Sequence, residues 1–570
     1  MRVDQKAEGP RQSMSWLHTW ASLILGWLLY AIFVTGTLSF FQNEISTWMK
    51  PETHQSIPAQ SQVQQMQVAL NYLQKNHPDA GSWNIQLPNS RQTTTEVTIR
   101  AVGEDPKARR GGKRITLDSA TGEVIEPRDT RGGGFLYRFH FELYGLPRLW
   151  TRWLVGIATM FMLVAIVSGI ITHKKIFKDF FTFRSGKGQR SWLDAHNATA
   201  VFALPFHLMI TFSGLLLLMF MFMPWGINQA YENRQQFLRD QQASMIEQPQ
   251  KAEDVPREGE RAARGERGQQ RGEHAQGRGE ERPSQPELRP ATLTDLAPIM
   301  AAVQQQWKDN PIASINIISP NTDQAKIELR ALRAESVAHR NVYATINYNG
   351  VTGQDETDKN IRIKNPSIPS GIYNVVTVLH EARGLDLALR WLLFCSGILG
   401  TLMVATGLIL WCVKRAPQQQ KQGYKSFGFR LVEVLNIAAI IGLPLACAAY
   451  FYANRFIPAD VEMRLNWEIR SFFTVWLLTL IYAIFRTHRQ AWLDLLLLAT
   501  LAFALLPVVN LMTGGQALWN SVGQGQWMIA SVDLAMWVMA VIFYFAYDKV
   551  KKHQGLPNKK VKVPVQEAEA

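Results

Sequence analysis

The chain has 570 residues, a formal net charge of +14 and 18 tryptophans. Most of the excess Lys and Arg flanks long apolar runs, which is the topology signal of membrane proteins, so we expect a lipid bilayer as partner and no nucleic acid. The three cysteines lie in apolar runs and no C-x-x-C-H motif occurs, which excludes a covalently attached c-type haem and gives no pattern typical of an iron–sulfur cluster or a disulfide framework.

Eight apolar runs are long enough to cross a bilayer of about 30 Å. They occupy residues 16–41, 148–173, 195–224, 386–413, 430–453, 470–486, 491–513 and 527–547. The first run is too long for a cleaved signal peptide, so we expect a retained anchor. The short connections between runs and the C-terminal tail are basic, which predicts that they and both termini lie in the cytoplasm of a bacterial inner membrane. The two long connections, 42–147 and 225–385, then face outward.

The two long connections contain similar water-soluble segments. Residues 58–126 and residues 291–355 each show a helix pattern followed by strands, and each ends with a strand, Thr-Gly and a strand, which is a hairpin signal. Residues 232–290 are rich in Arg, Glu, Gln and Gly and have almost no large apolar side chains. This composition cannot bury a core and predicts a disordered tether.

The first four spans contain an internal repeat. The run that begins "SWLHTW" resembles the run that begins "SWLDAH", and "HFELYGLPRLW" resembles "HEARGLDLALRW". When Gly36 is aligned with Gly214, His18 falls on His196. Each half of the repeat therefore consists of a helix, a soluble segment and a second helix, and the last four spans lie outside it.

Six histidines lie in or at the ends of the first four spans, where an ionisable side chain is costly and marks a candidate functional site. They are His18, His140, His173, His196, His207 and His380. Imidazole is nearly neutral at pH 7 and is the least costly metal ligand to place in a membrane. The competing interpretation of any single one is an ordinary interfacial residue at a helix end.

The repeat predicts how four of these histidines pair. A pseudo-twofold relation would bring His18 to His196 near the cytoplasmic side and His140 to His380 near the outer side. Each pair could supply both axial ligands of one haem b, so we predict two haems at two depths that carry electrons across the membrane. His173 and His207 have no repeat partner, and they could be ligands, hydrogen-bond partners of ligands or proton-relay groups.

Three parts of the sequence carry a family resemblance. They are the "SWLHTW" run, the block at 171–214 that begins "ITHKKIFKDFFTF", and the two soluble segments that end "LDSATGEVI" and "INYNGVTGQ". Over residues 14–415 the chain resembles the PepSY-associated transmembrane family, and within it the iron-regulated inner-membrane proteins that include ferric-siderophore reductases. The resemblance implies haem b held by the six histidines and reduction of iron(III) chelates at the periplasmic face. The insertion at 232–290 and the four extra spans depart from the family pattern.

We therefore predict a mainly α membrane protein with eight transmembrane helices, two small α+β PepSY-like periplasmic domains and an internal repeat in the first four helices. The units are 1–41 (N-terminus and first span), 42–147 (first PepSY-like domain), 148–224 (second and third spans), 225–290 (tether), 291–385 (second PepSY-like domain), 386–413 (fourth span), 414–547 (cytoplasmic loop and four spans) and 548–570 (cytoplasmic tail).

The predicted function is a haem-dependent ferric-chelate reductase. Electrons from an external donor, a quinol or a cytoplasmic reductase, would reduce an iron(III)-siderophore or similar chelate, and iron(II) binds hard oxygen ligands more weakly. No G-x-G-x-x-G follows a strand, so the chain is expected to lack its own nicotinamide or flavin site. The alternatives are a non-redox PepSY-type regulatory or binding protein and a metal-chelate permease, and both predict a colourless protein. No catalytic residue is assigned.

Overall fold

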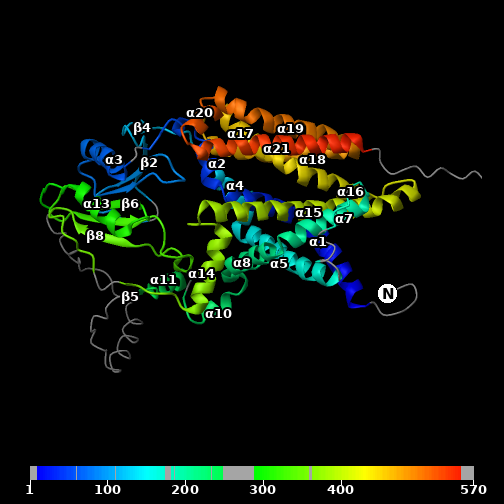
Figure 1. Ribbon diagram of the computed structural model, residues 1–570, viewed down its shortest axis with the longest axis horizontal. Helices are drawn as coiled ribbons and strands as arrows, with labels where there is room; N and C mark the ends of the chain where they lie inside the picture. Colours follow the sequence, from blue (N-terminus) through cyan, green and yellow to red (C-terminus); the bar gives the residue numbers. More distant parts are fainter. Residues whose placement is uncertain are drawn as a thin grey trace, which may run out of the picture.

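The computed structural model describes residues 9–58, 61–108, 111–173, 177, 182–184, 186–232, 234–247, 288–358 and 362–553. It shows a bundle of long helices with a β-sheet layer beyond one end (Figure 1). Among the described residues, seven helices are long and apolar enough to cross a membrane, and one bent helix pair brings the number to eight. The prediction of a mainly α membrane protein with eight spans is confirmed at this level.

The first half of the bundle is built from α1 (Pro10–Ser39), α5 (Arg148–Thr172), the pair α7 (Gln189–Phe202) and α8 (Leu204–Leu217), and α15 (Leu387–Gln422). The helix α1 packs against α5 and α15, while α7 packs against α15 and α5 against α8. The fourth span is longer than predicted, because α15 continues past residue 413 into the expected cytoplasmic loop.

The third span is not the single straight helix that the apolar run at 195–224 predicts. The helices α7 and α8 meet at Ala203 with a bend of 67°. Pro205 lies in the first turn of α8, where proline is tolerated because its missing N–H would be unpaired there in any case. The short helices α9 (Met219–Phe222) and α10 (Pro224–Asn228) follow α8.

The second half of the bundle consists of the extra spans. They are α16 (Phe427–Ile437) with α17 (Leu443–Phe456), joined by the π-helical turn η3 (Ala438–Gly442), then α18 (Arg464–Phe485), α19 (His488–Met512), the short α20 (Leu518–Gly523) and α21 (Trp527–Lys552). Their core is continuous with that of the first half, since the Tyr30 hydroxyl donates to the carbonyl of Ile440 at 3.1 Å and Trp27 Nε1 donates to Asn436 Oδ1 at 2.9 Å.

The two soluble segments form one antiparallel sheet in the order β4-β3-β2-β1-β6-β7-β8. The strands are β1 (Ser82–Gln86), β2 (Thr95–Arg100), β3 (Lys113–Leu117) and β4 (Val124–Ile125) from the first segment, and β6 (Ile312–Ile318), β7 (Lys326–Ala331) and β8 (Thr345–Asn349) from the second. The central pair is β1 with β6, where Trp83 lies opposite Ile317. The sequence predicted two small PepSY-like domains, and in the structure the two segments are joined into one sheet through this strand pair.

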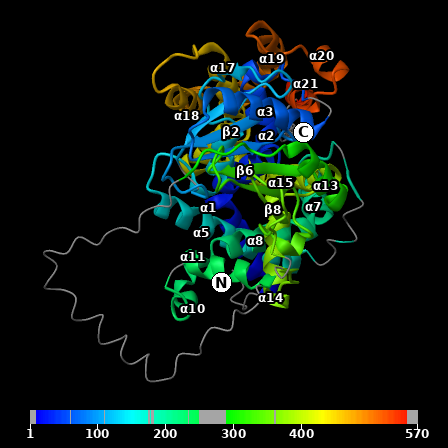
Figure 2. The same cartoon turned by 90° about the vertical axis from the view of Figure 1, so that its left-hand side faces the viewer.

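One face of the sheet is apolar and the other is polar, as strand alternation requires. Trp83, Ile85 and Ile315 belong to a core that α3 (Gln62–Asn76) and α13 (Leu296–Trp307) cover. Asn84 and Asn316 lie opposite each other on the other face. The two helices lie on the side of the sheet turned away from the bundle (Figure 1), the side that faces the viewer in Figure 2, so the polar face is turned toward the membrane helices.

Short elements connect the sheet to the bundle. They are α2 (Gln42–Trp48), η1 (Pro51–Thr53), α4 (Gly133–Glu142), η2 (Val337–His339) and α14 (Ile368–Glu381). The predicted tether begins with structure, because α11 (Arg234–Ala243) is followed by β5 (Ile246–Glu247), which pairs with β9 (Arg362–Ile363). The rest of the tether, 248–287, lies outside the described residues, as do 1–8, part of the basic connection at 174–185, and the tail from 554.

Candidate functional site

Two histidine pairs lie at two levels of the bundle. His18 of α1 and His196 of α7 have ring centroids 6.3 Å apart, and we call them the far-side pair. His140 of α4 and His380 of α14 have ring centroids 6.1 Å apart, and we call them the sheet-side pair. The structure thus brings together the residues that the repeat relates, one from each half of the chain.

Three of these four imidazoles are held by the backbone of a neighbouring helix. The Nδ1 atom lies 2.9 Å from the Ala165 carbonyl oxygen for His18, 2.8 Å from that of Ile32 for His140, and 2.9 Å from that of Met403 for His196. A carbonyl oxygen can only accept, so each Nδ1 carries the hydrogen and donates it. The lone pair of the neutral ring is then on Nε2, for which no hydrogen bond is found within the described part of the chain.

His380 is held differently. Its Nδ1 lies 2.6 Å from the hydroxyl oxygen of Ser213 in α8. That hydroxyl donates its own hydrogen to the Met209 carbonyl oxygen, also at 2.6 Å, so its oxygen accepts from His380. The Ile210 carbonyl is within interaction range of the same imidazole. The tautomer of His380 is therefore the same as in the other three, with Nε2 as the free nitrogen.

Each of the four imidazoles lies against a glycine of the neighbouring helix. The closeness is measured by the distance from the ring to a Cβ atom added at the glycine. This distance is 2.6 Å for Gly36 and His140 and 3.2 Å for Gly169 and His18. It is 3.1 Å for Gly407 and His196 and 3.5 Å for Gly214 and His380. In every case the glycine comes four residues after the carbonyl that faces the ring. The ring reaches that carbonyl because no side chain projects from the helix at this point.

A Ser or Thr precedes each of these glycines, and this is the signal that the sequence analysis missed. The pairs are Thr35-Gly36, Ser168-Gly169, Ser213-Gly214 and Thr406-Gly407. Each hydroxyl donates to the carbonyl four residues earlier in its own helix. Each of these four helices has such a Ser/Thr-Gly pair, and α15 has a second one at Ser396-Gly397, so the pattern would have pointed to the helices that receive the histidines.

The other two candidate histidines belong to neither of these two pairs. His173 ends α5 at the far side, where its amide donates to the Gly169 carbonyl oxygen at 3.2 Å. His207 is fully buried near the start of α8, with its ring centroid 6.2 Å from that of Phe33. Neither ring nitrogen of His207 has a hydrogen-bond partner among the described residues. Both residues lie within electrostatic reach of His196 of the far-side pair.

Charged groups surround the sheet-side pair. Glu142 comes two residues after His140, and Glu381 directly follows His380. Each glutamate is held by two arginines, Glu142 by Arg148 and Arg152, and Glu381 by Arg340 and Arg383. Because arginines outnumber glutamates two to one in this group, it places net positive charge beside the sheet-side pair.

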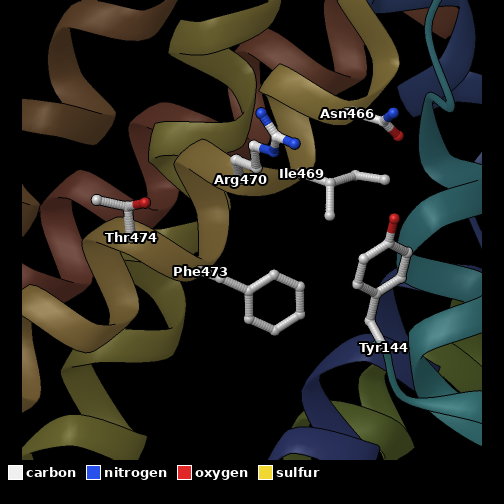
Figure 3. A pocket seen from close by; sticks show the side chains of 6 residues that line it. All are labelled: Tyr144, Asn466, Ile469, Arg470, Phe473 and Thr474. Carbon is white, nitrogen blue, oxygen red and sulfur yellow. The ribbon is translucent and has the colours of Figure 1, made fainter. Parts of the chain in front are cut away.

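A pocket of about 430 Å³ opens beside α18 (Figure 3). Its lining residues are Tyr144, from the turn between α4 and α5, and Asn466, Ile469, Arg470, Phe473 and Thr474 of α18. The Tyr144 and Phe473 rings stack with centroids 5.6 Å apart. None of the candidate histidines lines this pocket, so it contributes no ligand to either pair.

The described residues contain no group of three or more His, Cys, Asp or Glu side chains arranged to hold a metal ion. The two histidine pairs are a different kind of arrangement, in which two imidazoles face each other. Such a pair can hold a metal whose other ligands come from a macrocycle, as in bis-histidine haem sites.

A family model described as the PepSY-associated TM region matches residues 15–414. No curated protein matches the chain closely enough to count as a relative. The match covers both halves of the repeat, the two segments that share the sheet and all six candidate histidines, and it ends before α16. The resemblance is thereby confirmed at the level of the family, and the chain belongs to the PepSY-associated transmembrane family.

Proposed function

We propose that the protein is a haem b oxidoreductase of the bacterial inner membrane. It would pass electrons from a quinol or a cytoplasmic reductase across the bilayer and reduce iron(III) chelates, such as ferric siderophores, in the periplasm for iron release. The observation that carries this proposal is the pair of facing imidazoles at each of two levels, each ring held with its Nε2 free.

The spacing of the rings supports bis-histidine ligation. An imidazole nitrogen binds a first-row metal ion at about 2.0–2.1 Å and lies about 1.1 Å from its ring centre, so two imidazoles on opposite sides of one metal ion have centres about 6.3 Å apart. The observed values are 6.3 Å for the far-side pair and 6.1 Å for the sheet-side pair. The donor set also fits, because neutral imidazole with a second nitrogen fixed by a hydrogen bond is the usual state of a metal-ligating histidine.

The chain's own residues would hold and orient the group. Haem, when bound, would supply a one-electron carrier, and the two imidazoles of each pair would hold it. The carbonyls of Ala165, Ile32 and Met403 and the hydroxyl of Ser213 fix the ring orientations. The glycine opposite each ring lets it lie close to the helix backbone.

Chelate reduction would take place at the sheet-side pair. The arginine excess around Glu142 and Glu381 would attract an anionic chelate. The polar face of the sheet, on which Asn84 and Asn316 lie opposite each other, is turned toward the same end of the bundle. The positive-inside pattern, which predicts that the sheet faces the periplasm, supports this assignment of the outer end.

The visible spectrum of the purified full-length protein tests the proposal. With haem supplied during expression, we expect a reducible, low-spin, six-coordinate b-type spectrum and about two haems per chain, because each pair holds one. The haem content is measured by extraction and the reduction by dithionite difference spectra. A folded protein that stays colourless under these conditions would end the reductase interpretation and favour the regulatory or binding alternative.

The break between α7 and α8 is the observation that favours a permease, because transporters build substrate sites from interrupted helices near the bilayer centre. The buried His207 lies just after this break. A permease predicts uptake of an iron chelate into proteoliposomes without any electron donor. We expect no such uptake, and chelate reduction only when a reductant is supplied.

The glycines opposite the histidines give a graded prediction. Gly36→Ala should displace His140 and lower the haem content strongly, because the new Cβ would lie 2.6 Å from the ring. Gly214→Ala should have a smaller effect, since its Cβ would lie 3.5 Å from His380. The control is Gly134→Ala in α4, where a Cβ meets nothing within 4 Å. Equal haem content in all three variants, measured per folded protein, would contradict the packing argument.

A further inference from the structure

We infer that Ser213 sets the reduction potential of the sheet-side haem, and that its hydroxyl makes this haem easier to reduce than a backbone carbonyl in its place would. The inference rests on the proposed function and goes beyond it, because it concerns the direction in which electrons move between the two sites. Ser213 acts through His380 and is a positioning residue.

The inference starts from the group that accepts the hydrogen bond from Nδ1 of each paired histidine, which differs at one of the four. His18, His140 and His196 each donate from Nδ1 to a backbone carbonyl at 2.8–2.9 Å. His380 instead makes its close contact with a hydroxyl, Ser213, at 2.6 Å. The difference lies in one half of the sheet-side pair only.

The hydroxyls at the other sites do not take the same role. The Ser168 hydroxyl oxygen lies 3.5 Å from His18 Nδ1, and that of Thr406 lies 3.4 Å from His196 Nδ1. Both distances exceed the usual range for N–H···O hydrogen bonds. Each of these two histidines has a carbonyl at 2.9 Å as its main partner. Ser213 therefore differs from Ser168 and Thr406 because its hydroxyl lies within hydrogen-bond distance of the histidine.

The acceptor at Nδ1 changes the electronic character of an axial imidazole. A stronger acceptor draws the Nδ1 hydrogen outward, makes Nε2 a stronger electron donor and favours iron(III), which lowers the reduction potential. An amide carbonyl is a stronger acceptor than an alcohol oxygen. Ligation by His380 should therefore favour iron(II) more than ligation by His18, His140 or His196 does.

The direction of this effect suits outward electron transfer. In the step concerned, one electron leaves iron(II) at the far side and reduces iron(III) at the sheet side, and no bond or proton is exchanged. Raising the potential of the sheet-side iron makes this step more favourable. The iron(III) chelate then takes the electron from the sheet side.

Redox titration followed by visible absorption tests the inference in the purified full-length protein. Ser213→Ala removes the hydroxyl and leaves the Ile210 carbonyl as the acceptor for His380, so we expect the potential of one haem to fall while the other stays unchanged. Repeating the comparison in a His18→Ala/His196→Ala background assigns the shift to the sheet-side haem. The low-spin electron paramagnetic resonance signal of that haem should shift in the same samples, and a loss of packing alone would not move it at constant haem content.

Two matched variants complete the test. Ser168→Ala should leave the reduction potentials of both haems unchanged, because His18 keeps its carbonyl partner. Ser213→Thr should keep the wild-type potential, because threonine also has a hydroxyl. A Ser213→Ala protein with full haem content and an unchanged or raised sheet-side potential would overturn the inference while leaving the proposed function intact. A colourless wild-type protein would instead end the proposed function.

Discussion

Replacing His196 by alanine is expected to remove one of two haems and to leave the other in place. His196 faces His18 at a centroid distance of 6.3 Å, and the sheet-side pair draws its ligands from α4 and α14, so the two sites share no ligand. Without the His196 imidazole the far-side haem would lose one of its ligands, and the hydrogen bond to the Met403 carbonyl that orients this ring is lost as well. The haem content per chain, measured by extraction, should fall from about two to about one.

The complementary variant separates the two levels by function. In His140→Ala/His380→Ala the far-side haem should remain reducible from the donor side, while reduction of an iron(III) chelate should be lost. His77→Ala is the control, because His77 lies at the end of α3 in the sheet layer and belongs to neither histidine pair. Full haem occupancy in His140→Ala/His380→Ala would remove both residues from the set of ligands.

The pairing of the histidines could be predicted because the two halves of the repeat have the same spacing between histidine and glycine. Gly36 lies 18 positions after His18, and Gly214 lies 18 positions after His196. A duplicated unit that packs against its copy brings equivalent positions together, so the relation in sequence became a relation in space. The partners of the rings were not foreseen, because the Ser/Thr-Gly pairs that accompany them were not recognised as a signal.

The joined sheet and the broken third span depend on packing that local patterns do not record. Strand β1 has a core side chain at Trp83 and Ile85, but alternation cannot tell an edge strand from one that pairs with the other segment. In the third span an apolar run continues through Ala203 and Pro205, so hydropathy showed one helix where the backbone turns by 67°. Proline permits such a bend without requiring it.

The extra spans show how far the family comparison reaches. The family match ends before α16, yet Tyr30 and Trp48 of the matched part belong to the same apolar core as Tyr450 and Phe472 of the extra spans. Trp48 Nε1 donates to Asp533 Oδ1 at 2.7 Å across this boundary. Packing against the first four helices is therefore one role of these spans.

Buried charge at the junction of the two halves gives the largest expected effect on stability. Arg464 and Glu468 of α18 form an ion pair whose side chains are 1% and 0% exposed. Glu468 also accepts hydrogen bonds from the Thr130 hydroxyl at 2.7 Å and the Asn454 amide at 2.8 Å. Arg464 donates to the Asp129 carbonyl at 2.9 Å, so the pair ties the segment before α4 to the extra spans.

Glu468→Gln is expected to destabilise the protein by about 3–5 kcal/mol, because it keeps the volume but leaves the Arg464 guanidinium buried without a counter-charge. The matched control is Asp494→Asn, which breaks the Arg486–Asp494 pair, whose side chains are 48% and 41% exposed, and which should cost at most about 1 kcal/mol. The double variant Arg464→Met/Glu468→Leu should recover part of the loss, since no lone charge remains. Thermal unfolding of the purified proteins in one detergent ranks the three, and a Glu468→Gln midpoint as high as that of Asp494→Asn would show that the pair does not hold this junction together.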